Sequence, residues 1–541
     1  MKIKNYRILA GVLGLGVCLS AAGPTAIGSE AKKMGEGDIP LYKDMFDQAV
    51  YSEGLNQLDL GRWGRKLFGQ KIPSAGVNIF DEVPDSAFFT NRHARQKMSP
   101  EELEEGPGVT PGPDLSAPLQ VLSVEQEGAQ YEFLVEDFQK ARFVLRFDPQ
   151  GWAELNTAAD VIGSRFYHAI GYNVPETTIL FFTAEQLIAA PEGVAYENTG
   201  FTKKLTQDLL QQYLLFVPLP NGVYRASASK VPDGERVGNF SFTGRSRKNP
   251  QDLVNHRDLR EIRALGIFAA WLNHYEMLES NTLDVLVSQE GMPVLKHYLT
   301  DFTNTLGADT CGAKEAMFGH EHMVDYGETF KAILGLGFWE RPWQKKQRSA
   351  GSGNYSPAVG RFNNDLFDPA GYKNLLPYET FRQVTRADGF WAAKVMMGFS
   401  DGDIRAMVKA GRYSLPEDGA HVAGVLSERR DMIAAYWFSQ VSPLDLILFS
   451  GNKLSFKDLA VLYGFVPQEG TVYLAEMTSG TEKVGTLESV APEITVPLER
   501  LSDGVTLRID LKVSRPGSNK ALPPVTVLLS SGGIREIRHA D

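Results

Sequence analysis

Three side chains near the middle of the sequence have the types and spacing that phosphoryl transfer requires. Glu276 and Asn281 stand five residues apart in the polar segment 274–281, and Asp301 comes later, directly before Phe302. Phosphoryl transfer needs an acid that accepts the proton of the attacking hydroxyl, and an Asn and an Asp that hold magnesium against the nucleotide phosphates. We therefore take Glu276 and Asp301 as candidate catalytic residues, with Asn281 and Asp301 as candidate magnesium ligands.

The same three residues also have an ordinary structural interpretation. Glu276 fits a solvated surface turn, Asn281 fits a residue that orders a turn, and Asp301 fits a strand end at which a carboxylate accepts backbone hydrogen bonds. The spacing alone does not separate this interpretation from the catalytic one, so both stay open.

Alternating and helical patterns on either side of these residues predict the elements that would position them. We expect two antiparallel strands joined by a turn near 137–140, then a helix and a third strand. A buried amphipathic helix follows later, and its polar loop 274–281 leads into a pair of strands. The expected elements are 130–136, 142–147, 156–170, 174–182, 258–273, 282–287 and 294–299.

This layout resembles protein kinases, in which an acid and an Asn lie five positions apart in the catalytic loop and a metal-binding Asp-Phe follows a strand pair later. The chain looks like an uncharacterised family of exported bacterial proteins with a kinase-like core, similar to HipA-type and lipid-kinase-like proteins. The resemblance lies in the stretches 80–92, 147–175, 259–307 and 386–431. It implies an α+β fold with a bilobal core, and an ATP- and magnesium-dependent transferase that acts on a hydroxyl acceptor.

The resemblance also assigns cofactor-binding roles, and at each of them this sequence departs from the kinase pattern. Arg146 stands where the small-lobe Lys is expected, Asp160 is the nearest candidate for its helical carboxylate partner, and Glu154 is a second candidate. Glu276 stands where the catalytic Asp is expected. Each replacement keeps the charge and changes the reach, and Arg does not replace Lys neutrally at a phosphate site. A Gly-rich phosphate loop before Arg142 is also missing, because 127–129 holds a single Gly.

The N-terminus has the three parts of a secretory signal peptide: a basic start, the apolar run Ile8–Ala22 and small residues up to Gly28. The apolar run is shorter than the roughly 20 residues of a membrane-spanning helix. We therefore predict export to the periplasm or the exterior, without a transmembrane span in the mature chain. A lipoprotein anchored through Cys18 is the less favoured alternative, because Val17 is bulky where a small residue is expected.

Composition and charge limit the classes of partner. The chain of 541 residues carries a formal charge of -11, and loss of Lys2, Lys4 and Arg7 with the signal would leave -14. Such an acidic balance argues against a nucleic-acid partner or an anionic membrane surface. The length predicts several domains: a signal peptide at 1–28, a loop-rich extension at 29–117, a kinase-like small lobe at 118–250, a helical large lobe at 251–445 and a small all-β, sandwich-like domain at 453–541.

Two further functions remain compatible with these patterns. In the first, the kinase-like core is a pseudokinase that binds an unknown protein or envelope ligand without catalysis. In the second, the chain is a structural interaction protein of the cell envelope, and the residues at 276, 281 and 301 only stabilise the fold.

Overall fold

The computed structural model describes residues 39–52, 71–108, 112–127, 130–196, 202–246, 252–336, 338–350, 353–501, 505–518 and 520–541. Within these ranges the chain is a mixture of helices and strands, which confirms the predicted α+β class. The predicted signal peptide at 1–28 and Cys18 lie outside the described residues. No helix among the described residues is both long and apolar enough to cross a membrane.

A seven-stranded sheet forms one side of the molecule, with strand order β4-β7-β3-β2-β1-β5-β6. Only β1 and β5 pair in parallel. Apolar side chains of the sheet pack with Leu210 and Leu214 of helix α7 (Gln207–Leu214), so α7 covers one face. The strands are β1 (Leu119–Glu127), β2 (Gln130–Glu136), β3 (Arg142–Arg146), β4 (Thr177–Phe182), β5 (Leu187–Tyr196), β6 (Thr202–Lys204) and β7 (Tyr224–Lys230).

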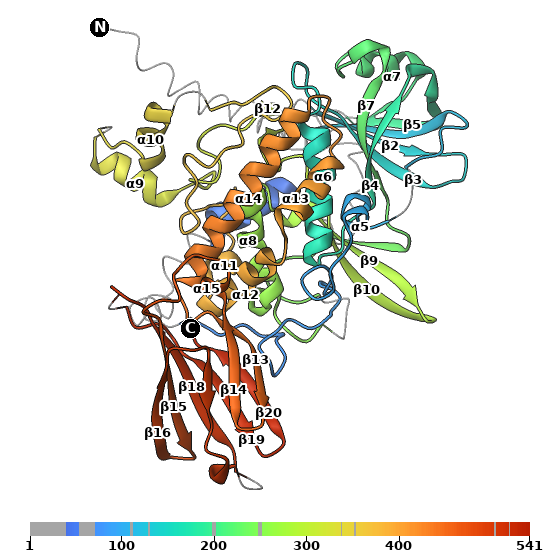
Figure 1. Ribbon diagram of the computed structural model, residues 1–541. Coiled ribbons are helices and arrows are strands. Elements are labelled where there is room, and N and C mark those ends of the chain that lie inside the picture. Colours follow the sequence, from blue (N-terminus) through green and yellow to red (C-terminus); the bar gives the residue numbers. More distant parts are fainter. Residues whose placement is uncertain are drawn as a thin grey trace.

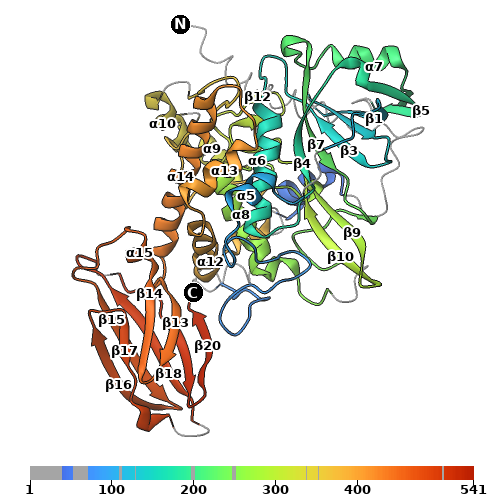
Figure 2. The same cartoon turned by 45° about the vertical axis from the view of Figure 1, so that its right-hand side comes forward.

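Helix α6 (Leu155–Ile170) lies between this sheet and the helical body of the protein (Figure 2). All of its residues except His168 are buried. The carboxylate of Asp148 accepts the backbone N–H groups of Glu154, Asn156 and Thr157, which would otherwise lack partners at the start of the helix. The sequence predicted this helix from its apolar spacing, and the prediction is confirmed.

The helical body shares one large apolar core with α6. Its main helices are α8 (Arg260–Leu272), α12 (Arg386–Met397), α13 (Asp401–Lys409) and α14 (Pro416–Phe438), with the short α11 (Glu379–Arg382) and α5 (Pro100–Glu105) beside them. A three-stranded sheet adjoins it, made of β8 (Glu235–Gly238), β9 (Thr282–Gln289) and β10 (Met292–Leu299). The strand pair predicted after the 274–281 loop is therefore confirmed as the β9–β10 hairpin.

Two helices follow the Asp301 turn at some distance along the chain. After the short β11 (Ala308–Asp309) and β12 (Gly312–Ala313), the helices α9 (Tyr326–Leu334) and α10 (Pro342–Ala350) project from the body. The described chain begins with α2 (Leu41–Met45), which is followed by the π-helix Phe46–Ser52. Although α2 is distant from it in sequence, α2 packs beside the 3-10 turn Glu279–Asn281.

The C-terminal strands form two sheets that enclose one apolar core. The strand β13 pairs with β14 and so belongs to the first of these sheets. The sheet therefore begins at Leu444, earlier than the predicted domain boundary at 453. The strands are β13 (Leu444–Ser450), β14 (Lys453–Asp458), β15 (Val472–Ser479), β16 (Glu482–Ser489), β17 (Glu493–Thr495), β18 (Leu507–Ser514), β19 (Val525–Ser530) and β20 (Gly533–His539), with the short helix α15 (Leu459–Leu462) after β14.

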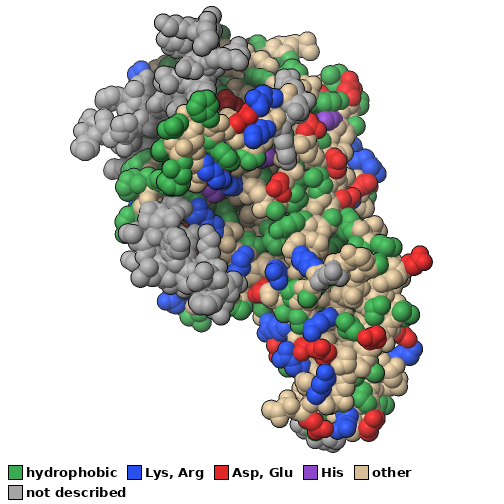
Figure 3. Space-filling view, turned by 90° about the vertical axis from the view of Figure 1, so that its left-hand side faces the viewer, with side chains coloured by type: hydrophobic (Ala, Val, Ile, Leu, Met, Phe, Trp, Pro, Cys, Tyr) green, Lys and Arg blue, Asp and Glu red, His purple; other side chains and the backbone are tan. Residues whose placement is uncertain are grey.

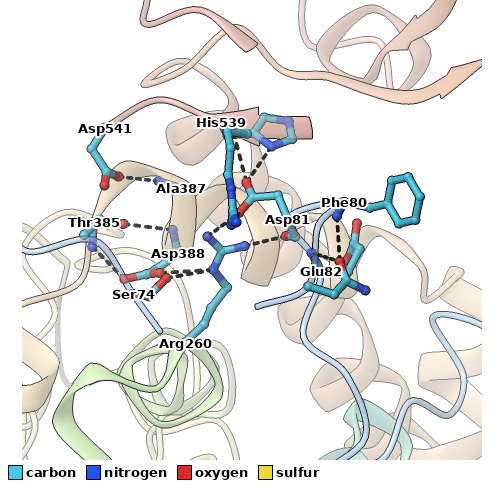
Figure 4. Close-up of polar contacts among 12 residues, drawn as sticks. Ser74, Phe80, Asp81, Glu82, Arg260, Thr385, Ala387, Asp388, His539 and Asp541 are labelled. Atoms are coloured by element: carbon cyan, nitrogen blue, oxygen red, sulfur yellow. Dashed lines mark hydrogen bonds and ion pairs between the residues drawn. The ribbon is translucent and has the colours of Figure 1, made fainter. Parts of the chain in front are cut away.

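Polar contacts around Asp81 join this C-terminal unit to the helical body (Figure 4). The buried guanidinium of Arg260 donates to Asp81 Oδ1 at 2.9 Å and to Asp388 Oδ1 at 3.2 Å. On the other side of Asp81, the imidazole Nδ1 of His539 lies 2.8 Å from Oδ2, and the Oδ1 of Asp541 accepts the N–H of Ala387. The last residues of the chain are thereby held against both the 71–108 segment and α12.

Candidate functional site

Arg146 on β3 brings together carboxylates from three different parts of the chain. Its guanidinium lies 2.5 Å from Glu132 on β2, 3.6 Å from Asp160 on α6 and 3.8 Å from Asp301 after β10. We call these four residues the Arg146 cluster. Asp160 is almost fully buried, whereas Glu132 and Asp301 keep 26% and 18% of their side chains exposed. Glu132 and Asp301 are therefore the two carboxylates of the cluster that keep contact with solvent.

The turn at Asp301 and Phe302 is held against α6 by a hydrogen bond and by close packing. Asp301 has a φ of +57°, a left-handed conformation that side chains other than Gly rarely adopt. The next backbone N–H, of Phe302, donates to Asp160 Oδ1 at 3.0 Å, and a Cβ on Gly163 would lie only 2.6 Å from the Cβ of Phe302. Thr303 donates to Asp301 Oδ1 through its backbone N–H and its hydroxyl. Such local strain is retained where surrounding contacts over-determine it, which is common at functional sites.

The charges in the cluster are unevenly balanced. Burial raises the pKa values of Glu132 and Asp160, although the charge of Arg146 opposes the effect. Burial acts on Asp301 in the same direction, but Arg146 and the hydrogen bonds from Thr303 outweigh it and lower its pKa. Arg146 and Thr303 therefore favour the ionised form of Asp301, whereas burial disfavours ionisation of Glu132 and Asp160.

Glu276 lies in a second group of polar residues, which adjoins the first. Its Oε2 accepts a hydrogen bond of 2.6 Å from the Asn304 amide. Burial, together with the negative charge of Asp309, raises the pKa of Glu276 to about 8. Burial also lowers the pKa of Lys314 to about 7, and its ammonium donates to the backbone oxygens of Asn273, Asn304 and Leu306. Glu276 is therefore mainly protonated at neutral pH.

Asn281 lies at the end of the same loop, next to the Asp301 strand end. Its side-chain amide donates to the backbone oxygen of Glu276 at 3.2 Å, and its own backbone oxygen accepts the N–H of Thr300 at 3.0 Å. The structural role that the sequence also allowed is present, since Asn281 orders the turn. The backbone bond to Thr300 places it beside Asp301.

Glu154 is not part of this arrangement. It stands directly before α6 and faces a loop of the helical body, where its carboxylate accepts the backbone N–H of Ser414 at 2.8 Å and the hydroxyl of the same residue. The structure therefore brings the first candidate partner, Asp160, to Arg146, and not the second. The difference arises because Asp160 lies on the side of α6 that faces β7, where Ser227 donates to it at 2.7 Å.

The residues present are compatible with magnesium held together with a nucleotide. In the described parts of the chain, no group of three or more His, Cys, Asp and Glu side chains is arranged to hold a metal ion. Magnesium in nucleotide sites is typically held by one or two protein ligands plus phosphates, so it needs no such group. Asp301, whose pKa is lowered by Arg146, and the neighbouring Asn281 meet that requirement. The Oδ1 of Asn304 is buried and has no hydrogen-bond partner among the described residues, so a further acceptor is present.

Sequence reasoning missed several members of the site, although one of them could have been found. In a hairpin that turns at 137–140, Glu136 pairs with Arg142, so Glu132 must stand opposite Arg146, as it does. The other missed residues come from segments without a recognisable pattern, and only the fold brings them to the site: Ser227, Thr303, Asn304, Asp309 and Lys314.

Comparisons with known proteins give few similarities. No protein-family model matches the chain, and no curated protein matches it. One solved structure to which it is similar is the Helicobacter pylori proinflammatory kinase CtkA, with 11% sequence identity and a TM-score of 0.27. The alignment covers 57% of this chain and 94% of that protein.

Proposed function

We propose that the Arg146 cluster and the adjoining 276–281 loop bind a magnesium–nucleotide complex and transfer a phosphoryl or nucleotidyl group to a hydroxyl-bearing acceptor. The observation that carries the proposal is the position of Arg146, within ion-pair distance of both Asp160 on α6 and Asp301 after β10. In kinases an equivalent cation and carboxylate must both be in place before transfer occurs. The resemblance seen in the sequence adds the five-residue spacing of Glu276 and Asn281.

Each residue has a role that follows from its contacts. Arg146 would face the phosphate oxygens, and Asp301 with Asn281 would hold the magnesium. Bound magnesium would offset the negative charge of the phosphates. Glu276 in its ionised form would accept the proton of the acceptor hydroxyl while the new O–P bond forms and the bond to the leaving oxygen breaks. Asn304 fixes the orientation of the Glu276 carboxyl through its hydrogen bond of 2.6 Å.

A second function, binding without catalysis, is favoured by two observations. Glu276 has a pKa of about 8 and is therefore a poor proton acceptor at neutral pH. Arg146 already has a close partner in Glu132, which competes with phosphate for the guanidinium. Either feature would weaken transfer while leaving ligand binding intact, as expected of a pseudokinase. A purely structural envelope protein would bind no nucleotide at all.

Thermal unfolding with and without magnesium and nucleotide tests the binding step. A ligand at a hundred times its Kd stabilises the folded chain by about 2.7 kcal/mol, so the unfolding midpoint should rise. Asp301→Ala should remove that rise, whereas Asp233→Ala should retain it, because the Asp233 side chain is 93% exposed and pairs with Lys230 at the surface. Absence of any shift in the unaltered chain would favour the structural function. A shift that persists in Asp301→Ala would contradict the metal assignment.

Incubation of the chain with labelled nucleotide separates a transferase from a binding protein. The double variant Arg146→Lys with Glu276→Asp restores the kinase pattern at both positions, and we expect it to increase release or transfer of the label. A nucleotide-dependent thermal shift without any such increase would support the non-catalytic function.

We also propose that the protein is exported, on the basis of the basic, apolar and small-residue segments within 1–28. N-terminal sequencing of the protein recovered from its native cell envelope would test this. Processing close to Gly28 is the expected result, and a retained Met1 in the cytoplasmic fraction would contradict it. Export would also separate the site from cytoplasmic ATP, which makes the identity of the donor the first property to measure.

A further inference from the structure

Helix α9 is oriented with its apolar side toward solvent. The one residue of α9 that is buried is Glu328, at 8% exposure, whereas Phe330, Ile333 and Leu334 are each more than 60% exposed. The residues after the helix continue the same surface. We call this surface the α9–α10 face, and its exposed apolar residues are Tyr326, Phe330, Ile333, Leu334, Leu336 and Phe338, the last of them 92% exposed.

Polar contacts underneath hold this face in position. The Glu328 carboxylate accepts the indole N–H of Trp339 at 2.9 Å and pairs with Lys331 at 2.8 Å. At the base of α10, Glu321 accepts the indole N–H of Trp343 at 2.5 Å and pairs with Arg341 at 2.7 Å. These polar contacts fix the inner side of α9 against the rest of the chain, so the apolar side of the helix faces solvent. Contiguous exposed apolar surface of this kind marks an interaction site.

The segment that carries the face is basic, although the chain is acidic. Residues 326–350 contain five Lys or Arg and two Glu, a net charge of +3 within a chain of -11. Three of the basic side chains pair with carboxylates: Lys331 with Glu328, Arg341 with Glu321 and Arg348 with Glu340. Figure 3 shows this side of the molecule, with hydrophobic side chains gathered in its upper part and Lys and Arg beside them. Aromatic and aliphatic side chains flanked by basic ones are the pattern of segments that lie in the interface of an anionic bilayer.

We propose that the α9–α10 face docks onto the surface of a membrane that contains anionic phospholipid. The apolar residues would enter the boundary between headgroups and acyl chains, and Lys345 would contact lipid phosphates, as would Arg348 on exchanging its partner Glu340 for phosphate. A second copy of the chain is a poorer occupant, because a symmetric contact would place two faces of charge +3 against each other. The helix α9 has nine residues, too few to cross a bilayer, so the chain would lie on the membrane surface.

The acidic balance of the whole chain, from which we predicted no anionic membrane surface, does not oppose this contact. Charges more than about 8 Å apart are largely screened at physiological ionic strength. The sign of the charge close to the lipid therefore determines the interaction, and near the α9–α10 face it is positive.

Hydrogen exchange of the amides in 326–348 tests the proposal in the full chain. A local readout is needed, because the apolar run Ile8–Ala22 could itself bind lipid. Vesicles of phosphatidylcholine with phosphatidylglycerol should slow exchange in α9 by at least about tenfold, since the amides then open only in the unbound state. Phosphatidylcholine alone should have a much smaller effect. Phe330→Ser with Phe338→Ser should abolish the slowing, and the matched control Phe138→Ser with Leu448→Ser, which removes exposed apolar side chains elsewhere, should retain it.

Two further experiments test the role of the basic residues and the possibility that a second copy of the chain, and not a membrane, covers the α9–α10 face. Lys345→Gln and Arg348→Gln should each weaken binding to the anionic vesicles by roughly fivefold. Unchanged exchange in α9 with anionic vesicles would overturn the proposal, as would equal slowing by both vesicle types. Slowing that appears without lipid as the protein concentration rises would also overturn it and would assign the face to a second copy of the chain.

Discussion

Glu276 is the residue whose protonation state separates the proposed transferase from a binding protein. Its side chain is half-buried, accepts one hydrogen bond from Asn304 and lies near the negative charge of Asp309. These surroundings raise its pKa from 4.5 to about 8. Added positive charge near Asp301 would lower the pKa again, so bound magnesium would convert Glu276 toward the form that accepts protons.

The raised pKa predicts how stability changes with pH. Between pH 4.5 and about 8 the unfolded chain loses the Glu276 proton while the folded chain keeps it, so the folded state binds more protons and loses stability as pH rises. The loss of folding stability caused by this one group reaches at most about 5 kcal/mol above pH 8, at 1.36 kcal/mol per pKa unit. We expect Glu276→Gln to have a smaller loss of stability over this range in denaturant titrations at a series of pH values. Identical pH profiles for the two chains would contradict the buried, protonated carboxyl.

At the scale of elements, α6 connects the seven-stranded sheet to the Asp301 turn. Asp160 near the middle of the helix accepts hydrogen bonds from Ser227 on β7 and from the N–H of Phe302, and it also pairs with Arg146. A displacement of α6 would therefore disturb the candidate cation and the candidate metal ligand together. The close approach of α6 to Phe302 depends on the missing side chain of Gly163.

Gly163→Ala should separate α6 from the Asp301 turn. The added Cβ would lie 2.6 Å from the Cβ of Phe302, which is closer than carbon atoms approach, so one of the two segments must move. We expect a loss of roughly 1–3 kcal/mol in the free energy of unfolding, together with a smaller thermal shift on addition of magnesium and nucleotide.

Gly424→Ala is the matched control, because a Cβ on this α14 residue meets nothing within 4 Å. It should stabilise the chain by about 0.5–1 kcal/mol through helix propensity. Equal effects of the two substitutions would show that the approach of α6 to Phe302 is not a tight contact.

At the scale of the whole molecule, Arg260 and Asp81 together join parts of the chain that are distant in sequence (Figure 4). Arg260 pairs with Asp81 of the N-terminal segment and with Asp388 of α12, and Asp81 pairs in turn with His539 of the last strand. Burial opposes ionisation of Asp81, but the hydrogen bond from His539 and the charge of Arg260 lower its pKa to about 2. The stabilisation from Asp81 is therefore complete above pH 3.8 and is lost as the pH falls through about 2.

Arg260→Met should destabilise the chain strongly, because it removes one cationic partner from each of two buried carboxylates, and leaves Asp388 with Arg263 and Asp81 with His539. Loss of one partner from a buried ion pair typically costs about 3–5 kcal/mol. Arg508→Met is the control, since Arg508 is 54% exposed and pairs with Asp510 at the surface, and it should change stability by less than about 1 kcal/mol. Calorimetry should show unfolding of the C-terminal strands separating from that of the helical body in Arg260→Met. A single unshifted transition would mean that other contacts hold the two parts together.

Local order was well predicted from the sequence, because neighbouring residues determine it. The apolar spacing of 156–170 and the turn at 137–140 predicted α6 and the β2–β3 hairpin, and the hairpin register by itself puts Glu132 opposite Arg146. The spacing of Glu276 and Asn281 and the later Asp301 were equally visible. These features depend on hydrogen bonds and periodicities that span a few residues.

Only the tertiary structure decided which distant groups meet and in what state. Asp160 and Glu154 both lie at the expected helix, yet packing of α6 against β7 brings only Asp160 to Arg146. Burial, and not the loop sequence, makes Glu276 hold its proton near neutral pH. The outward orientation of α9 likewise follows from contacts of Glu328 with Trp339 and Lys331. Burial of a side chain and pairing between distant segments depend on how the whole chain packs. Local sequence patterns, which reflect only neighbouring residues, therefore do not predict them.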